Sequence, residues 1–162
     1  MMPRPILTFA LLLAATATSG AARESAPSCA LVGDSIAVEA AQYLRGCRLN
    51  AKIGIPSGAV VARVDPAAEI NVVSAGSNDP DEPDLRANLE RIRARAKRTI
   101  WILPAIASAR AAVREIAAKH GDAVVWFAPR SDGVHPASAA TLAQAIDAAI
   151  AQSNDVPSNV GG

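Results

Sequence analysis

Two hydrophobic patterns alternate along the chain from residue 30 onward. Mainly apolar runs, such as 70–75, are typical of strands that are buried on both faces of a sheet. Segment 83–98 instead repeats apolar residues every three or four positions with charges between them, which predicts an amphipathic helix. Together the patterns predict strands at 30–33, 49–53, 70–75, 99–103 and 123–128, and helices at 36–45, 59–64, 83–98, 107–120 and 136–152.

The regular alternation of strand and helix predicts an α/β fold. A helix between each pair of strands implies a parallel sheet with helices on both faces. In such sheets the ligand crevice lies at the carboxyl ends of the strands. Polar clusters follow four of the predicted strands, so we expect them to meet at this edge: they are 34–35, 54–58, 76–79 and 131–135.

Both ends of the chain differ from the middle. Residues 1–22 carry Arg4, then an apolar run at 6–17, then small residues at 19–22, which is the pattern of a cleaved secretory signal peptide. An uncleaved anchor is the alternative. We therefore expect a periplasmic or secreted domain at 23–152 that keeps no membrane span after cleavage. The polar, glycine-ended segment 153–162 is predicted to be a disordered tail.

The composition limits the range of partners. With 162 residues, 51% of them hydrophobic, the chain can bury the core of one domain. A net charge of +1 gives no attraction to nucleic acid. The arginines of segment 86–98 share their predicted helix with acids, as on a solvated helix face. We expect a monomer that acts on a small-molecule or glycan acyl ester.

The two cysteines, Cys29 and Cys47, are predicted to form a disulfide. Export places them in an oxidising compartment, and their even number, with no histidine close by, favours a bridge over metal ligation. Cys29 precedes the first predicted strand, and Cys47 follows a helix that returns toward the start of that strand. Two free buried thiols are the alternative.

Ser35 is the candidate nucleophile. The sequence Gly33-Asp34-Ser35 lies where the first predicted strand ends and a helix begins, so the serine stands on the turn and its N–H lies among the free donors of the helix start. A serine hydroxyl is a weak nucleophile by itself. It requires a base, an acid that orients the base, and donors that stabilise the oxyanion.

The candidate base is His135, and Asp132 is the candidate acid. The chain has two histidines, and the other, His120, stands at the end of a predicted helix, where the helix dipole accounts for it. Asp132 precedes His135 by three residues, within reach of the imidazole Nδ1, so that Nε2 is free to face the nucleophile.

Three groups are candidates for the oxyanion hole. They are the N–H of Ser35, the N–H of Gly54 and the side-chain amide of Asn78, which follows a buried strand. Gly58 is the alternative to Gly54. We prefer Gly54 because it lies directly at the end of the second predicted strand.

The order and spacing of these motifs resemble those of the SGNH hydrolases, also called the GDSL esterase/lipase family. The resemblance extends from residue 31 to about 150 and rests on Gly33-Asp34-Ser35, Gly54, Gly76-Ser77-Asn78-Asp79 and Asp132-Gly133-Val134-His135. It implies a flavodoxin-like three-layer sandwich, with a five-stranded parallel sheet of order 2-1-3-4-5, and no metal or organic cofactor. It also implies a Ser35-His135-Asp132 triad, with Ser35, Gly54 and Asn78 as oxyanion donors.

The function that follows is that of an exported serine esterase for small acyl esters, O-acetyl esters among them. Ile36 stands where the family usually has leucine, and only an apolar anchor is needed there. The chain is short for the family and leaves little room for a lid or a long acyl groove, which disfavours long-chain lipids.

Other functions stay open at this stage. An α/β-hydrolase shares the order Ser, Asp, His, but its nucleophile does not follow the first strand, and its acid and base lie on two loops. A non-catalytic module that binds acylated envelope glycans is a second alternative. Thioesterase and lysophospholipase activities also fit, because the substrate loops carry no distinguishing motif.

Overall fold

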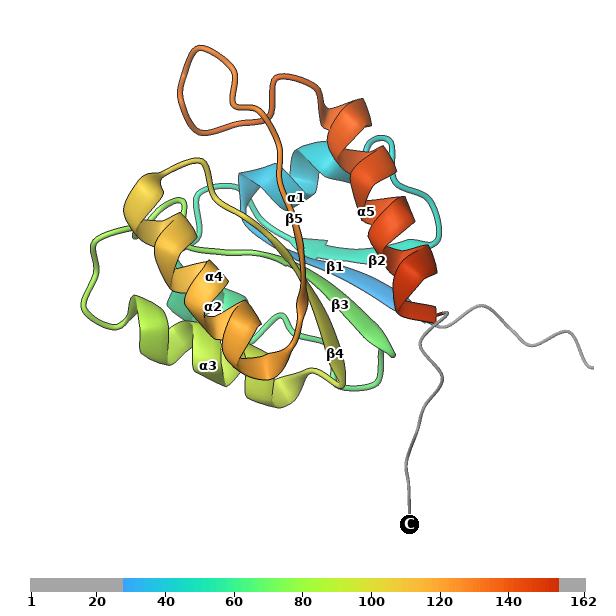
Figure 1. Cartoon of the computed structure of the whole chain (residues 1–162), viewed down its shortest axis with the longest axis horizontal. Coiled ribbons are helices and arrows are strands. Elements are labelled where there is room, and N and C mark those ends of the chain that lie inside the picture. The colour runs from blue at the N-terminus through green and yellow to red at the C-terminus, as the bar shows by residue number, and fades with distance from the viewer. Residues whose placement is uncertain (1–27, 155–162) are drawn as a thin grey trace, which may run out of the picture.

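A five-stranded parallel sheet forms the centre of the computed structural model, which describes residues 28–154 (Figure 1). The strand order is β2-β1-β3-β4-β5, so the predicted α/β class and sheet order 2-1-3-4-5 are confirmed. The predicted signal peptide at 1–22 lies outside the described residues, as do residues 155–162 of the expected tail. The strands are β1 (Cys29–Gly33), β2 (Cys47–Ala51), β3 (Ile70–Ser74), β4 (Arg98–Ile102) and β5 (Ala123–Val125).

Five helices cover the two faces of the sheet. In Figure 1, α1 and α5 lie on one face, and α2, α3 and α4 lie on the other. The result is the three-layer sandwich expected from the sequence. The helices are α1 (Ser35–Ala40), α2 (Ser57–Val61), α3 (Leu85–Arg95), α4 (Ala107–His120) and α5 (Ala139–Asn154).

The strands supply side chains to both faces in alternation. In β1, Ala30 and Val32 join the core beneath α2, α3 and α4, while Leu31 joins the core beneath α1 and α5. All five residues of β1 are buried, and so are all five of β3. This explains why neither strand shows an alternating pattern. The two polar residues of β3, Asn71 and Ser74, are also fully buried, and both form hydrogen bonds.

Helix α4 was predicted with its observed bounds, whereas most other boundaries differ from prediction. Helix α1 ends at Ala40 instead of residue 45, because the N–H groups of Gln42 and Tyr43 bond to carbonyls three positions back, those of Glu39 and Ala40. Strand β2 is Cys47–Ala51 instead of 49–53, because its register pairs Cys47 with Cys29. The bounds of α2, α3, β3, β4 and β5 differ from those predicted by one to three residues at one end or both.

Helix α5 begins three residues later than predicted. Pro136, the expected first residue, instead pairs as an isolated antiparallel bridge with Pro129. The helix then runs to Asn154, so Ser153 and Asn154, which we assigned to the tail, are its last residues. None of the helices within residues 28–154 has both the length and the apolar character that a bilayer crossing requires.

The predicted disulfide between Cys29 and Cys47 is confirmed. The sulfur atoms are 2.06 Å apart, and the two residues are register partners at the first positions of β1 and β2. The bridge therefore fixes the edge strand β2 to the central strand β1 at the amino end of the sheet.

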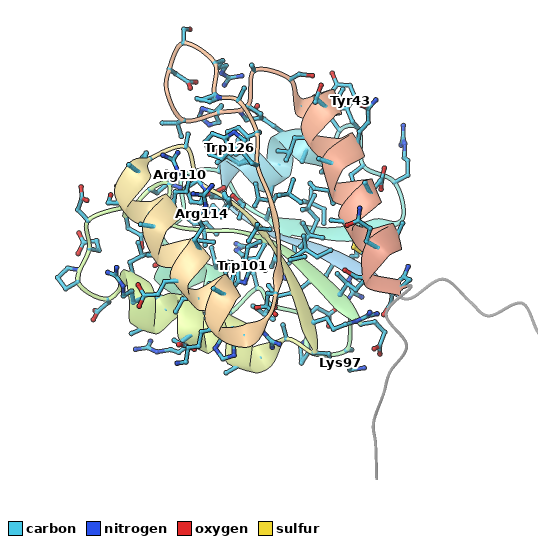
Figure 2. All side chains as sticks on the ribbon, in the orientation of Figure 1. Tyr43, Lys97, Trp101, Arg110, Arg114 and Trp126 are labelled. Atoms are coloured by element: carbon cyan, nitrogen blue, oxygen red, sulfur yellow. A yellow bond between two sulfur atoms is a disulfide. The ribbon has the colours of Figure 1, made fainter. Side chains whose placement is uncertain are left out.

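The two tryptophans lie in contrasting surroundings (Figure 2). Trp101 of β4 is fully buried, and its Nε1–H donates to Asp122 at 3.0 Å. Trp126, immediately after β5, is 45% exposed, and the guanidinium of Arg110 lies 4.8 Å from the centre of its ring.

Removing the disulfide with Cys29→Ala/Cys47→Ala should lower the free energy of unfolding by about 3 kcal/mol, because the bridge closes a loop that would otherwise be free in the unfolded chain. Urea unfolding of the variant and of the unreduced wild type measures the difference. As a control, thiol titration of the unfolded, unreduced wild type should find no free thiol, and two titrating thiols would contradict the bridge.

Candidate active site

Ser35 is the first residue of α1, directly after the turn that ends β1. Asp34 precedes it as the N-cap residue, and the Oδ1 atom of Asp34 accepts from the Ile36 N–H at 3.1 Å. This capping bond fixes the first turn of α1. Ser35 is 9% exposed, whereas its neighbours Asp34 and Ile36 are fully buried.

Asp34 also joins the turn to the neighbouring strand. Its Oδ1 accepts from the Ser74 hydroxyl at 2.6 Å, while Oδ2 is buried and has no partner among the described residues. Burial raises the pKa of the Asp34 carboxyl, and the bonds from Ser74 and Ile36 offset part of that rise. The Asp34 carboxyl thus links the turn before Ser35 to strand β3.

Gly33 is required by the close approach of β1 to β3. Its φ is +141°, and a Cβ at this position would lie 2.1 Å from the carbonyl oxygen of Ser74. No other residue type fits this space. The close approach places the residues after Gly33 and Ser74 side by side at the carboxyl edge of the sheet.

The three predicted triad residues lie in one hydrogen-bonded chain. His135 Nε2 is 2.9 Å from Ser35 Oγ, and His135 Nδ1 is 2.9 Å from Asp132 Oδ2. An ionised carboxylate only accepts, so the Nδ1 proton must point to Asp132. Nε2 is then the acceptor for the Ser35 hydroxyl proton.

Asp132 is held by several donors. Its Oδ1 accepts from the backbone N–H groups of Val134 at 2.8 Å and His135 at 2.9 Å, and its Oδ2 accepts from Arg130 Nε at 2.8 Å. The Arg130 bond, followed by the two backbone bonds, holds the pKa of Asp132 well below its usual range. The carboxylate therefore stays ionised beside the imidazole.

The loop that carries Asp132 and His135 closes on itself. The N–H of Arg130 donates to the carbonyl of His135 at 2.8 Å, and the N–H of Gly133 donates to the carbonyl of Arg130 at 2.9 Å. In Figure 1 this loop rises between β5 and α5 and lies above the start of α1. Its shape explains how a residue 100 positions after Ser35 reaches the serine hydroxyl.

The two other predicted oxyanion residues lie on the loops that flank the serine turn. Gly54 follows β2, and Asn78 follows β3, the two strands that pair with β1. The amide of Asn78 donates to the carbonyl of Ile55 at 3.0 Å and so joins the two loops. One of its two N–H groups is used in this bond, which leaves the other for a ligand.

The two glycine candidates, Gly54 and Gly58, lie in different surroundings. Gly54 lies three residues beyond the end of β2, not directly at the strand end as expected, but it is next to the Ile55 carbonyl that Asn78 contacts. Gly58 lies inside α2, where an added Cβ would face the amide of Asn88 at 3.4 Å. Gly54 stays the predicted donor.

Two supporting groups were missed from the sequence. Asp79 accepts from the Ser57 N–H at 2.8 Å and from its hydroxyl, and Asn88 donates to the same hydroxyl at 3.0 Å. The pattern Pro56-Ser57 at a helix start was the available signal. Arg130 was also missed. The sequence indicated it only by its position two residues before Asp132.

His120 lies apart from this site. It ends α4, and its Nε2 is 2.8 Å from Glu90 Oε2 of α3. The described residues contain no group of three His, Cys, Asp or Glu side chains placed to ligate a metal ion.

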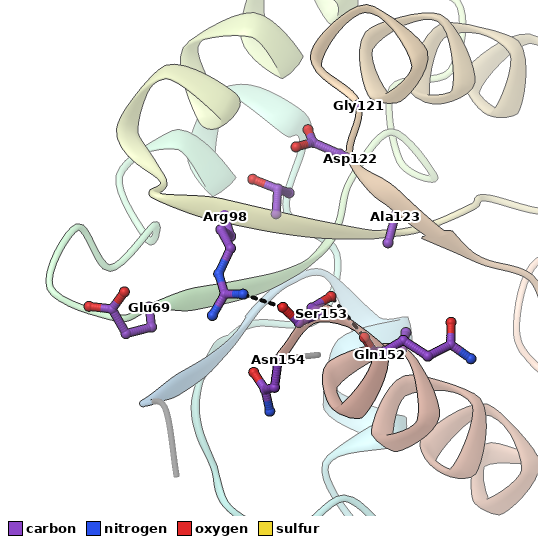
Figure 3. A pocket seen from close by; sticks show the side chains of 10 residues that line it. Glu69, Arg98, Gly121, Asp122, Ala123, Gln152, Ser153 and Asn154 are labelled. Carbon is purple, nitrogen blue, oxygen red and sulfur yellow. Dashed lines mark hydrogen bonds between the residues drawn. The ribbon is translucent and has the colours of Figure 1, made fainter. Parts of the chain in front are cut away.

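A cavity of about 710 Å³ lies at the opposite edge of the sheet (Figure 3). It is lined by Arg98 and Ala123, which begin β4 and β5, and by the end of α5, where Arg98 donates to the carbonyl of Ser153. Because the strands are parallel, this amino edge faces away from Ser35. The cavity is therefore no part of the candidate active site.

Comparison with known proteins supports the fold. No family model matches the chain, and no curated protein does. Among solved structures, the chain is similar to the C-terminal catalytic domain of Streptococcus pneumoniae peptidoglycan O-acetyltransferase A (OatA), which was determined with a methylsulfonyl adduct. The TM-score is 0.61 and the identity 17%, over 80% of this chain and 96% of that one. The chain thus shares the fold of that domain, which agrees with the fold expected from the resemblance.

Gly33→Ala should unfold the protein or lower its free energy of unfolding by more than about 4 kcal/mol, since the new methyl group overlaps the Ser74 carbonyl. Gly46→Ala is the matched control. Gly46 also has a positive φ but has no atom within 4 Å of an added Cβ, so we expect a loss of only about 1–2 kcal/mol. Equal losses in urea unfolding would contradict the close approach.

Proposed function

We propose that this chain is an exported serine esterase that cleaves small acyl esters through an acyl-enzyme on Ser35. The observation that carries the proposal is the continuous hydrogen-bonded chain from Ser35 Oγ through His135 to Asp132. A serine, an imidazole and a carboxylate in this order form the general device for activating a hydroxyl nucleophile.

The reaction follows from the geometry. His135 Nε2 takes the proton of Ser35 as Oγ attacks the ester carbonyl, and the imidazolium then gives that proton to the leaving alkoxide. Water, deprotonated by His135, then attacks the acyl carbonyl. The bond between the acyl carbon and Ser35 Oγ breaks, the imidazolium returns the proton to Oγ, and the acid is released. Asp132 stays ionised throughout and stabilises the imidazolium, as its lowered pKa favours.

The oxyanion is stabilised by donors from three adjacent loops. We assign this role to the N–H of Ser35, the N–H of Gly54 and the free N–H of the Asn78 amide. Their support is the position of their loops after β1, β2 and β3, which neighbour one another in the sheet. Each donor of this kind typically contributes about 3 kcal/mol to transition-state stabilisation.

Two features support export and a small acyl group. The Cys29–Cys47 disulfide suits an oxidising compartment, in agreement with the signal-like sequence at 1–22. The longest connection at the carboxyl edge, 126–138, already carries Asp132 and His135, and the other four leave little chain to build a deep acyl groove. We infer that acetyl and other short acyl esters are the substrates, carried by a small molecule or an envelope glycan.

Acyl transfer to a sugar hydroxyl is the second candidate function. It is favoured by the structural similarity to the catalytic domain of a peptidoglycan O-acetyltransferase. Both functions share the acyl-enzyme and differ in whether water or a hydroxyl accepts the acyl group. Product analysis with p-nitrophenyl acetate, in the presence and absence of a chitooligosaccharide, separates acetate release from acetylated sugar.

Ser35→Ala and His135→Ala should each lower kcat for p-nitrophenyl acetate by about a thousandfold or more, because each removes a part of the nucleophilic device. Release of p-nitrophenol by the chain from residue 23 onward measures this, and His120→Ala serves as the control with an unchanged rate. We also expect octanoate esters to react more slowly than acetate. Equal background rates in all proteins would favour the non-catalytic binding module.

Asn78→Ala should lower kcat by about 100- to 1,000-fold with a much smaller change in KM, because the amide acts on charge that develops in the transition state. Asn50→Ala is a matched control, since the amide of Asn50 likewise donates to a loop carbonyl, that of Arg63 at 2.8 Å. A loss within a few-fold of the Asn50 variant would remove Asn78 from the oxyanion hole.

A further inference from the structure

The guanidinium of Arg130 lies between two carboxylates that belong to different parts of the fold. Its Nε donates to Asp132 Oδ2 at 2.8 Å, and its Nη2 donates to Glu39 Oε1 at 3.0 Å, with Nη1 3.5 Å from Glu39 Oε2. Two nitrogens of one planar group thus bind the acid of the loop and a residue of α1 at once. Such a two-sided contact needs the fork shape of arginine.

The two carboxylates have direct relations to the reacting groups. Asp132 shares the oxygen that Arg130 contacts with the Nδ1 of His135. Glu39 stands on α1 four residues after Ser35, about one helical turn away. Arg130 therefore joins the loop that carries the imidazole to the helix that carries the nucleophile.

We propose that Arg130 is a positioning residue that sets the distance and direction between His135 and Ser35. The proposal rests on the proposed function, in which these two side chains exchange a proton. Arg130 orients the Asp132 carboxylate and ties the loop to α1 through Glu39. Without the Arg130 side chain, Asp132 keeps the two backbone bonds to Oδ1, so the loop retains its shape. The loop is then no longer bonded to α1 through Glu39.

The exposure of these side chains argues against a role in stability. The exposed fractions are 46% for Arg130, 40% for Asp132 and 24% for Glu39. Ion pairs this exposed contribute little to the free energy of unfolding, since water and salt screen them. The backbone bonds between Arg130 and His135 already close the loop, so the guanidinium is left with orientation as its main effect.

The test compares Arg130→Met, Arg130→Lys and Glu39→Gln with the wild type. Arg86→Met is the matched control, because Arg86 forms a similarly exposed pair with Glu115, at 2.9 Å, between α3 and α4. Three quantities are measured: kcat and KM for p-nitrophenyl acetate, the melting temperature, and the ¹⁵N shifts of the neutral His135 ring. The ring shifts report which nitrogen carries the proton, and His120→Gln removes the only other histidine signal.

In Arg130→Met we expect kcat to fall by about 10- to 100-fold with KM within about twofold of wild type, since small displacements of reacting groups have effects of this size. The wild-type ring should be in the Nδ1–H form, and the variant ring should be a mixture of both tautomers. Arg130→Lys and Glu39→Gln should lose part of the rate. The melting temperature should change no more than in Arg86→Met.

Several results would overturn the proposal. They are a kcat in Arg130→Met equal to that of Arg86→Met, an unchanged tautomer, or a melting temperature far below that of the control, which would assign Arg130 to stability. If the wild type hydrolyses no ester, the proposed function fails, and the ring shifts alone then decide the role of Arg130. In that case, a wild-type His135 ring without a preferred tautomer would contradict the positioning role of Arg130.

Discussion

The position of β1 between β2 and β3 is the constraint on which the candidate site depends. All three strands are parallel, and Gly33 at the end of β1 is the register partner of Ala51 and of Ser74. Three loops must therefore leave the sheet side by side. Strand pairing alone therefore brings together the turn at Ser35, the loop of Gly54 and the loop of Asn78. The absence of a side chain at Gly33 lets the backbones of β1 and β3 approach closely enough.

The loop between β5 and α5, which carries Asp132 and His135 (the imidazole loop), is not placed next to Ser35 by strand pairing. It follows β5, which is separated from β1 by β3 and β4, so it must cross part of the sheet edge to reach Ser35. Local bonds give it shape: the bridge between Pro129 and Pro136, the backbone contacts of Arg130 and the carboxylate of Asp132. The site thus combines a part fixed by the sheet with a part fixed by its own loop.

This division also explains what the sequence could predict. Buried runs such as that of β3 and the helical repeat of α4, ended at Gly121, are local signals, and both elements were located correctly to within one residue. The disulfide was predicted from the residues, and the sheet order from the family resemblance. Boundaries that depend on partners were wrong, as for β2, whose start is set by its register with Cys29.

In the site, residues with motif spacing were found, and those defined by contact between distant segments were missed. Asp132 and His135 are three residues apart, so their relation can be read from the chain. Glu39 and Arg130 are 91 positions apart, and neither belongs to a motif, so only their contact shows the relation. The role of Asp79 at Ser57 was hidden for the same reason.

The contrast between the two tryptophans has a practical consequence. Trp101 is enclosed in the core, whereas Trp126 stands half-exposed just beyond β5, on the stretch that leads into the imidazole loop. The protein therefore carries two natural fluorophores. Trp101 reports on the core, and Trp126 reports on the surface beside the loop of His135. Quenching by iodide would reach the second and spare the first, so that events at the loop become visible in an unlabelled, folded molecule.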